Sequence, residues 1–245
     1  MEPMVEVEDL YSTYGDRFVL EGVTMQVRAH EIMTIVGGSG CGKTTLLKHI
    51  IGLYTPHSGR IRLFGRDIIG MDEAEFGALL KQIGVMFQHG ALLNSITVGE
   101  NVALPLQMHT DLSDALIYKI VRMKLHLVEL DHAFDLYPPE LSGGMRKRAA
   151  LARAIVMDPK ILFCDEPCAG LDPMLSLEID RLLTTLNHTL NMTIVLVTHE
   201  LESIRRIAHR ITMLDAGKVL FSGTLEEAER SGIRRMEEFF LKRET

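Results

Sequence analysis

Cysteines are few and long apolar runs are absent in this 245-residue sequence, and each shortage excludes a class of protein. The three cysteines, Cys41, Cys164 and Cys168, form a sparse, odd set without the spacing of metal ligands. They argue against a disulfide framework and a zinc site, and they favour a reducing compartment. No uninterrupted apolar stretch approaches the roughly twenty residues that a membrane-spanning helix needs. The sequence therefore predicts a soluble chain whose membrane role, if it has one, depends on partners.

Positive charge is also scarce, because 26 lysines and arginines stand against 33 aspartates and glutamates, for a net charge of −7. This balance argues against a nucleic-acid partner, since such proteins carry a basic patch or stripe. The first ten residues hold four acidic side chains and no apolar run, so we expect neither a signal peptide nor a transit peptide there. One local basic cluster has helical spacing, which predicts a solvated or interface face. Its members are Arg146, Lys147, Arg148 and Arg153.

Short β-rich runs alternate with helical patterns along the chain, which is typical of an α/β fold with a parallel sheet. We find no internal repeat and no linker, so we expect one domain with a helical insertion near residues 89–155. Strands are expected at 18–27, 31–36, 60–64, 83–87, 161–165, 193–198, 211–214 and 218–221. Helices are expected at 46–51, 113–129 with Ser113 as N-cap, 146–157, 174–189, 200–208 and 226–241.

A glycine cluster connects an expected strand to an expected helix and fits the phosphate-binding loop pattern. Its glycines let the backbone wrap closely around phosphates, and the helix N-terminus adds a favourable dipole. Lys43 supplies a positive charge for the β- and γ-phosphates, and the Thr44 hydroxyl is placed to ligate Mg²⁺. The loop alone does not distinguish kinases, GTPases and motors. The predicted binding residues are Gly37, Gly38, Ser39, Gly40, Cys41, Gly42, Lys43, Thr44 and Thr45.

A second group of candidate residues stands at the end of an apolar strand. Residues 161–164 are apolar and are followed by Asp165 and Glu166. A doubly wound sheet presents ligands in this way, at the C-terminal ends of its strands. Asp165 is the candidate Mg²⁺ ligand, through the hydration shell of the ion, and Glu166 is the candidate general base for the attacking water. The alternative is an acidic strand end that caps a turn before Pro167.

A third feature, residues 141–145, precedes a strongly helical stretch. Ser142 is a good N-cap, and Gly143 and Gly144 expose backbone N–H groups at the helix N-terminus. This is a second anion-binding end, separate from the glycine loop. One nucleotide has one γ-phosphate, so two such ends in one chain suggest a composite site.

With these motifs in this order, the sequence resembles the ATP-binding-cassette (ABC) ATPases over essentially its whole length. The resemblance implies that the chain binds ATP and Mg²⁺ and hydrolyses ATP. Tyr14 stands where the family places an aromatic ring that stacks on adenine. Gln88 stands at the loop glutamine that touches Mg²⁺, and His199 stands at the switch histidine that faces the γ-phosphate.

The family signature corresponds to residues 141–145, with Met145 where glutamine is usual. The resemblance implies a homodimer packed head to tail, in which Ser142, Gly143 and Gly144 of each chain meet the ATP of the other. Asp172, in a Gly-Leu-Asp loop, would contact the opposite chain. Because the change at Met145 leaves the serine and both glycines in place, we expect the phosphate-binding role to be kept.

The resemblance also implies a fold: an α/β, RecA-like P-loop NTPase core with a mostly parallel sheet. To this core the family adds an N-terminal antiparallel β subdomain, here about residues 1–30 and 58–70, and an inserted α-helical subdomain, about residues 89–155. We therefore expect residues 1–245 to form a single ABC ATPase domain.

Met145 and two segments, residues 87–93 and 97–106, resemble more narrowly the ATPases of MCE-type lipid transporters, including the maintenance-of-lipid-asymmetry (Mla) systems. This resemblance implies a phospholipid cargo and an integral membrane permease that docks near residues 88–105. It also implies a periplasmic MCE lipid-binding protein and often a STAS-domain subunit. The chain would lie on the cytoplasmic face of a bacterial inner membrane as a peripheral subunit.

Other functions remain open at this point. An ABC transporter ATPase for another cargo, such as lipoproteins or amino acids, would carry the same motifs. A soluble ABC ATPase that serves chromosomes or DNA repair would insert a long coiled coil, yet about a hundred residues without sustained heptads separate the glycine loop from the signature. Translation types carry two cassettes in one chain. A scaffold that binds ATP without hydrolysing it would lack a residue like Glu166.

Overall fold

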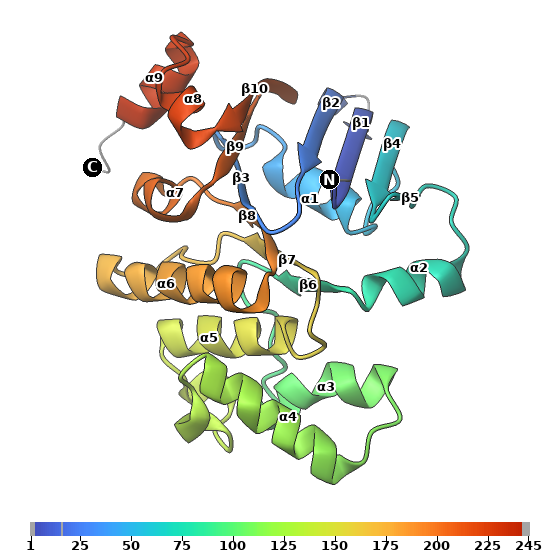
Figure 1. Ribbon diagram of the computed structural model, residues 1–245, viewed down its shortest axis with the longest axis vertical. Coiled ribbons are helices and arrows are strands. Elements are labelled where there is room, and N and C mark those ends of the chain that lie inside the picture. Colours follow the sequence, from blue (N-terminus) through green and yellow to red (C-terminus); the bar gives the residue numbers. More distant parts are fainter. Residues whose placement is uncertain (1–2, 16, 242–245) are drawn as a thin grey trace.

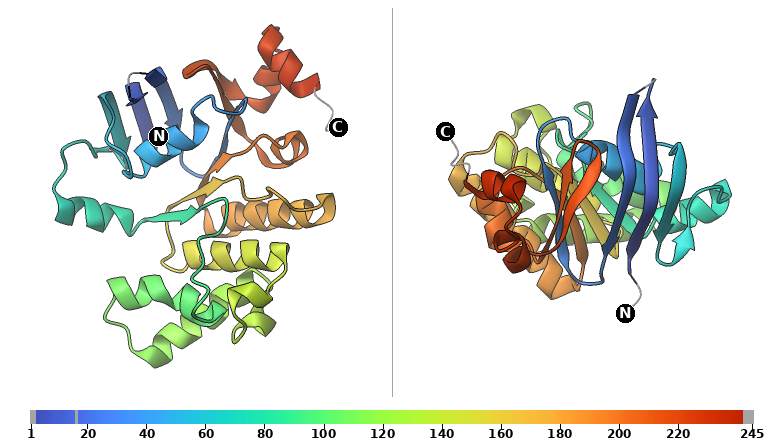
Figure 2. Two further views of the ribbon diagram at one scale, coloured as in Figure 1. Left: turned by 180° about the vertical axis from the view of Figure 1, so that it is seen from behind. Right: turned by 90° about the horizontal axis from the view of Figure 1, so that it is seen from above.

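The computed structural model describes residues 3–15 and 17–241. The expected domain of residues 1–245, with its acidic start, thus includes positions 1, 2, 16 and 242–245, which lie outside the described residues. Two sheets occupy one half of the molecule, and a group of helices forms the opposite end (Figure 1). Seen from above, the two sheets lie side by side (Figure 2), and the amide of Glu21 in one donates to the carbonyl of Gly217 beside the other at 2.9 Å.

The first sheet is antiparallel, with the strand order β2-β1-β4-β5. Its first strand alternates with period two, as a half-buried strand should: Val5 and Val7 are buried, whereas Glu6 and Glu8 face outward. Both glutamates form ion pairs with Arg62 of the neighbouring strand. The strands are β1 (Val5–Tyr14), β2 (Arg17–Val27), β4 (Ser58–Leu63) and β5 (Arg66–Asp67).

The second sheet has the order β10-β9-β3-β8-β7-β6, in which only β10 runs antiparallel to its neighbour. Strands β3, β7 and β8 are buried along their whole length, because helices cover both faces of a parallel sheet. The carboxyl ends of β3, β7 and β8 therefore meet at one edge, where ligands bind in such sheets. These strands are β3 (Ile32–Gly37), β6 (Ile83–Met86), β7 (Ile161–Asp165), β8 (Thr193–Val197), β9 (Arg210–Asp215) and β10 (Lys218–Thr224).

Helices flank this sheet, and α3, α4 and α5 gather at the far end of the molecule (Figure 1). Capping residues define the N-termini of several helices. Thr97 and Glu100 form a reciprocal capping box at α3, and Asp172 caps α6 ahead of Pro173. None of the helices in the described ranges is long and apolar enough to cross a bilayer. They are α1 (Lys43–Ile50), α2 (Glu73–Leu80), α3 (Val98–His109), α4 (Asp114–Leu127), α5 (Gly143–Ala154), α6 (Pro173–Leu190), α7 (Leu201–Ile207), α8 (Leu225–Glu229) and α9 (Arg234–Leu241), with 3-10 turns at Asp131–Ala133 and Pro138–Glu140.

The predicted fold class is confirmed: a mostly parallel core sheet is joined to an antiparallel sheet and carries inserted helices. The prediction of one terminal helix over residues 226–241 is wrong. The helix breaks at Gly232, which has φ +64°, and this left-handed backbone cannot continue a right-handed helix. Ser113 does stand at the N-cap of α4, but its side chain makes no capping hydrogen bond.

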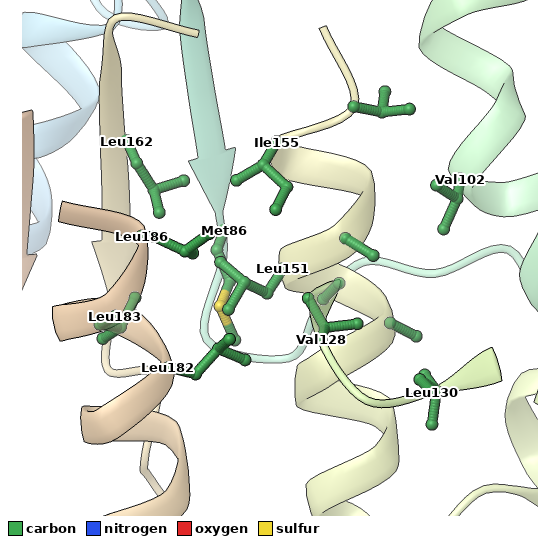
Figure 3. Close-up of a cluster of buried hydrophobic side chains, with 14 of the residues drawn as sticks. Met86, Val102, Val128, Leu130, Leu151, Ile155, Leu162, Leu182, Leu183 and Leu186 are labelled. Carbon is green, nitrogen blue, oxygen red and sulfur yellow. The ribbon is translucent and has the colours of Figure 1, made fainter. Parts of the chain in front are cut away.

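One hydrophobic core joins the inserted helices to the parallel sheet. Leu151 and Ile155, at the C-terminal half of α5 and just after it, lie beside Met86, Leu162 and Leu183 from the sheet and α6 (Figure 3). Each of these side chains is almost completely buried, and full burial of such a side chain contributes about 1.5–3 kcal/mol. The helix that begins at the signature is therefore packed firmly against the strands that carry the candidate catalytic residues.

Candidate functional site

A cavity of about 1350 Å³ opens at the carboxyl ends of the parallel strands. It collects residues that lie far apart in the sequence, from the glycine loop after β3 to the segment that follows β8. Helices α7 and α9 supply lining residues that the sequence did not predict, including Arg206 and Phe239. The predicted site residues that line the cavity are Gly37, Gly38, Ser39, Gly40, Lys43, Thr44, Gln88, Glu166 and His199.

The glycine loop runs from the end of β3 into α1 and curls around its own lysine. A Cβ on Gly37 would lie 2.3 Å from the carbonyl oxygen of Leu214, so no other residue fits there. The Lys43 ammonium donates to the carbonyls of Gly37 and Gly38, both at 3.0 Å. This arrangement holds a positive charge and a helix N-terminus against one end of the cavity, as binding of a polyphosphate requires.

Three predicted loop residues do not line the cavity: Cys41, Gly42 and Thr45. The Cys41 side chain is only 7% exposed and belongs to the hydrophobic core under the loop. Burial raises the pKa of its thiol. The sequence placed this cysteine among the phosphate-binding residues, but its side chain points into the core, because a loop that turns its amides toward a ligand turns alternate side chains away.

Two oxygen ligands for a divalent cation meet beside the loop. The Thr44 hydroxyl donates to Asp165 Oδ1 at 3.3 Å, although 121 positions separate the two residues in sequence. Asp165 is buried, and burial raises the pKa of its carboxyl, with repulsion from Glu166 as a further cause in the same direction. A buried, under-compensated carboxylate next to a hydroxyl fits Mg²⁺, which prefers hard oxygen ligands and few protein groups. Thr44 and Gln88 line the cavity, whereas Asp165 does not.

Glu166 and His199 form the candidate catalytic pair. His199 Nδ1 and Glu166 Oε1 are 2.8 Å apart, and the imidazole is largely exposed toward the cavity while the carboxylate is mostly buried. Within the described ranges, Glu166 Oε2 is buried and finds no hydrogen-bond partner. A buried polar atom without a partner is costly and marks a functional position. Glu166 itself lines the cavity, and its carboxylate is the candidate general base.

The remaining predicted residues do not line the cavity. Tyr14, at the tip of the β1–β2 hairpin, is 86% exposed. Ser142 Oγ accepts from the amide of Met145 at 3.2 Å and so caps α5, as predicted. Asp172 caps α6 through the amides of Met174 and Leu175. The signature serine and glycines thus do not line the cavity of the phosphate loop, and Asp172 does not either, although its neighbours Leu171 and Pro173 do.

The sequence predicts a solvated or interface face for the basic cluster, and Lys147 does not lie on a solvated face. Its side chain is 8% exposed, and its ammonium donates to the carbonyl oxygens of Gln88 at 2.6 Å and Glu166 at 3.1 Å. Arg153 donates to the carbonyls of Gly90 and Ala91, while Arg146 is exposed. Helical periodicity could have indicated the burial of Lys147, because residues 144, 147, 151 and 155 share one face of the helix and all four are buried.

The cavity thus unites a glycine loop and its lysine, an oxygen site for a divalent cation and a carboxylate–histidine pair. These are the parts of a P-loop nucleotide hydrolase. The described residues contain no cluster of three or more His, Cys, Asp or Glu side chains that could hold a metal ion. Thr44 and Asp165 accordingly fit an ion that takes its other ligands from phosphates and water.

Comparison with known proteins gives the family. A family model described as ABC transporter matches residues 20–169. The chain is 42% identical to the intermembrane phospholipid transport system ATP-binding protein MlaF of Haemophilus influenzae, over 96% of this chain and 89% of that protein. It is 38% identical to the methionine import ATP-binding protein MetN of Caulobacter vibrioides, over 91% of this chain and 68% of that protein.

Among solved structures, a dimeric ATP-binding cassette in a post-hydrolysis state, bound to ADP and Pi, superposes with a TM-score of 0.83. The two chains are 31% identical, and the match covers 91% of this chain and 99% of that one. The chain belongs to the ABC transporter family and is an ATP-binding, ATP-hydrolysing cassette. The resemblance inferred from the sequence is confirmed.

Proposed function

We propose that this ATPase energises the movement of phospholipid between the membranes of a bacterial envelope, as part of an MCE-type system. The observation that carries the proposal is the 42% identity to MlaF over nearly the whole of both chains. The resemblance of Met145 and of residues 87–93 and 97–106 to such ATPases agrees with it. Several methionine importers match nearly as well, so an ABC transporter ATPase for an amino acid is the second candidate.

The proposed roles of the site residues combine the geometry of the cavity with the family resemblance, and the role of Tyr14 rests on the resemblance alone. The loop amides and Lys43 bind the phosphates of ATP, and Tyr14 stacks on the adenine. Thr44, Gln88 and Asp165 would hold Mg²⁺, which would supply charge neutralisation at the phosphates. Glu166 accepts the proton of the attacking water.

His199, bonded to Glu166 at 2.8 Å, orients that carboxylate and faces the γ-phosphate. Burial of the carboxylate favours this chemistry, because a base in a dry site is not screened by bulk water. The two side chains come from different strand ends, so the pair forms only when the sheet is assembled.

We further propose that two chains pack head to tail, so that Ser142, Gly143, Gly144 and Asp172 of one chain complete the site of the other. Support comes from the dimeric state of the similar cassette and from the positions of Ser142, Gly143 and Gly144, which do not line the cavity of their own chain. An N-terminal turn of α5 capped by Ser142 presents amides that suit a phosphate.

The permease is proposed to dock near residues 88–105, at the junction of α2, α3 and α5. A groove of about 330 Å³ lies there and is lined in part by Lys81, Pro105, His109 and Met157. A mixed apolar and basic groove of this kind suits a short cytoplasmic helix of a membrane protein. The chain would then be a peripheral subunit on the cytoplasmic face of the inner membrane, with an MCE lipid-binding protein and a STAS-domain subunit in the same complex.

The experiment that tests the cargo is reconstitution of the chain with the permease that co-purifies with it. Fluorescent phospholipid and labelled methionine are offered to the same proteoliposomes, with Glu166→Gln as the inactive control. We expect ATP-dependent movement of the phospholipid alone. Movement of methionine without phospholipid would replace this proposal by the second candidate.

A further inference from the structure

Lys147 holds the two backbone segments that carry candidate hydrolytic residues. It is the only buried lysine of α5, and its ammonium donates to the carbonyl oxygens of Gln88 at 2.6 Å and of Glu166 at 3.1 Å. These segments are unconnected locally, since one follows β6 and the other follows β7. A charged donor makes a stronger bond to a carbonyl than a neutral one does, and burial keeps water from replacing it.

Glu166 needs such support because its backbone is unusual. Its φ is +49°, a left-handed value that non-glycine residues adopt only where the surroundings enforce it. Its amide donates to the carbonyl of Val197 at 2.8 Å, and its carbonyl accepts from the amide of Ala169 at 3.2 Å as well as from Lys147. The backbone of Glu166 is therefore held by three hydrogen bonds, one of which comes from α5.

Helix α5 also holds the segment after Gln88. Arg153 donates to Gly90 at 2.7 Å and to Ala91 at 2.8 Å, and both of these residues also have a positive φ, +73° and +50°. Helix α5 begins next to Ser142, the end that we propose to meet the ATP of a second chain. One rigid helix thus runs from the contact with the other chain to both loops of its own site.

We propose that Lys147 is a positioning residue for ATP hydrolysis: it transmits the placement of α5 to Gln88 and to Glu166. The proposal rests on the catalytic role given above to Glu166. Lys147 lies too deep to touch nucleotide, and it acts through the backbone of the residue that does the chemistry. Its loss should therefore slow turnover far more than it weakens nucleotide binding, which depends mainly on the loop amides and Lys43. A lysine that only stabilises the fold would not have this selective effect.

A second buried lysine offers a matched control. Lys124 of α4 is 3% exposed and pairs with Asp158, so it resembles Lys147 in burial and in linking two segments. Neither Lys124 nor Asp158 lines the cavity. Replacing either lysine by methionine removes the charge and keeps the length of the side chain.

The test compares Lys147→Met and Lys124→Met in the full-length chain, with kcat, KM for ATP and thermal stability measured for each. We expect both variants to lose stability. Lys147→Met should lose about 10–100-fold in kcat, since small misplacements of a catalytic group have effects of this size, with KM within about twofold. Lys124→Met should keep kcat. An unchanged kcat in Lys147→Met, or an equal loss in both variants, would overturn the proposal.

Hydrogen exchange gives a readout besides activity. In Lys147→Met, the amide of Ala169 and the amides of residues 88–91 should exchange faster together, because their segments lose a shared support. Unchanged exchange in both segments also overturns the proposal. If the methionine variant does not fold, Lys147→Gln replaces it, because glutamine keeps a shorter donor. The kcat of Lys147→Gln should lie below that of the unaltered chain and above that expected for Lys147→Met. If Glu166→Gln retains turnover, the role of Glu166 fails, whereas the exchange result still judges Lys147.

Discussion

The two anion-binding ends of this chain use the same physical device and differ in what surrounds it. At the glycine loop, a helix N-terminus shares one cavity with Lys43, Glu166 and His199, and Thr44 of that cavity bonds to Asp165 beside it. At Ser142, a helix N-terminus stands exposed, and its side chain only caps the helix. The first end thus carries the candidate groups for hydrolysis, whereas the second offers candidate groups for binding alone. We infer that the second end acquires its role when another chain supplies a nucleotide.

The largest effect should follow Glu166→Gln, which changes the glycine-loop end alone. The amide cannot take a proton from water, so turnover should fall by about 10²–10⁴-fold, the usual contribution of general-base catalysis. ATP binding should persist, and the chain should accumulate as an ATP-bound dimer. Steady-state ATPase assays and size-exclusion chromatography with light scattering measure both results. Turnover equal to that of the unaltered chain would remove Glu166 from the base role.

The next largest effect should be the recovery of ATPase activity when two variants are mixed, one changed at the glycine loop and the other at Ser142. Lys43→Ala should weaken nucleotide binding, and Ser142→Arg should block the other end, so each variant alone should be inactive. A mixed dimer regains one intact site, and random pairing should restore about one quarter of the activity, because a two-fold dimer has two equivalent sites. No recovery from dimers shown to be mixed would mean that each chain completes its own site.

The glycine-loop end was predictable because its signals are local. Strand β7 occupies residues 161–165 as expected, since a buried parallel strand is a continuous apolar run. The glycines before Lys43 and the acidic pair after β7 are likewise adjacent in sequence. What the sequence could not give is which side chains meet: the bond between Thr44 and Asp165 and the pair of Glu166 with His199 depend on the order of strands in the sheet.

Other features could not be predicted from residue type, because tertiary contacts decide them. A lysine suggests a solvated position, yet Lys147 is buried because two backbone carbonyls replace water around its ammonium. A proline argues against a helix interior, yet α3 continues through Pro105. Helix α2 was not predicted, although Asp72 at its N-cap is a local signal. The break at Gly232 also has a local signal, because a glycine inside a helical pattern favours the end of a helix.

A moderate effect on stability should come from Asp165→Asn. Burial raises the folded-state pKa of this carboxyl above its ordinary value of 3.8, so the folded chain binds a proton more readily than the unfolded chain does. The free energy of unfolding therefore falls as the pH rises from the ordinary pKa to the raised pKa of the folded chain, and it levels off above that. At pH 7 the asparagine variant should melt higher, by about 2–4 °C, the shift that about 1 kcal/mol produces in a chain of this size. Differential scanning calorimetry between pH 4 and pH 7 tests this.

Mg²⁺ should reverse the order of stability in that experiment. With Mg²⁺ and ATP present, the unaltered chain should gain stability that the variant lacks, because Asp165 then has a cation to compensate its charge. A variant that melts lower than the unaltered chain without Mg²⁺ would show that Asp165 is already compensated by Lys43 and Lys48, whose charges lower its pKa.

The smallest effect concerns Cys41, whose position in the loop predicts that alkylation blocks ATP binding and that ATP protects the thiol. The structure reverses this expectation. The thiolate is the reactive form, and burial both covers the Cys41 sulfur and raises its pKa. Iodoacetamide should therefore modify Cys41 slowly at pH 7, at a rate that ATP barely changes. Mass spectrometry can follow it beside Cys164, whose pKa burial raises to about 12 and which should react more slowly still. Fast labelling of Cys41 that ATP suppresses would place its side chain in the cavity, and the glycine-loop end would then be as accessible as the end at Ser142.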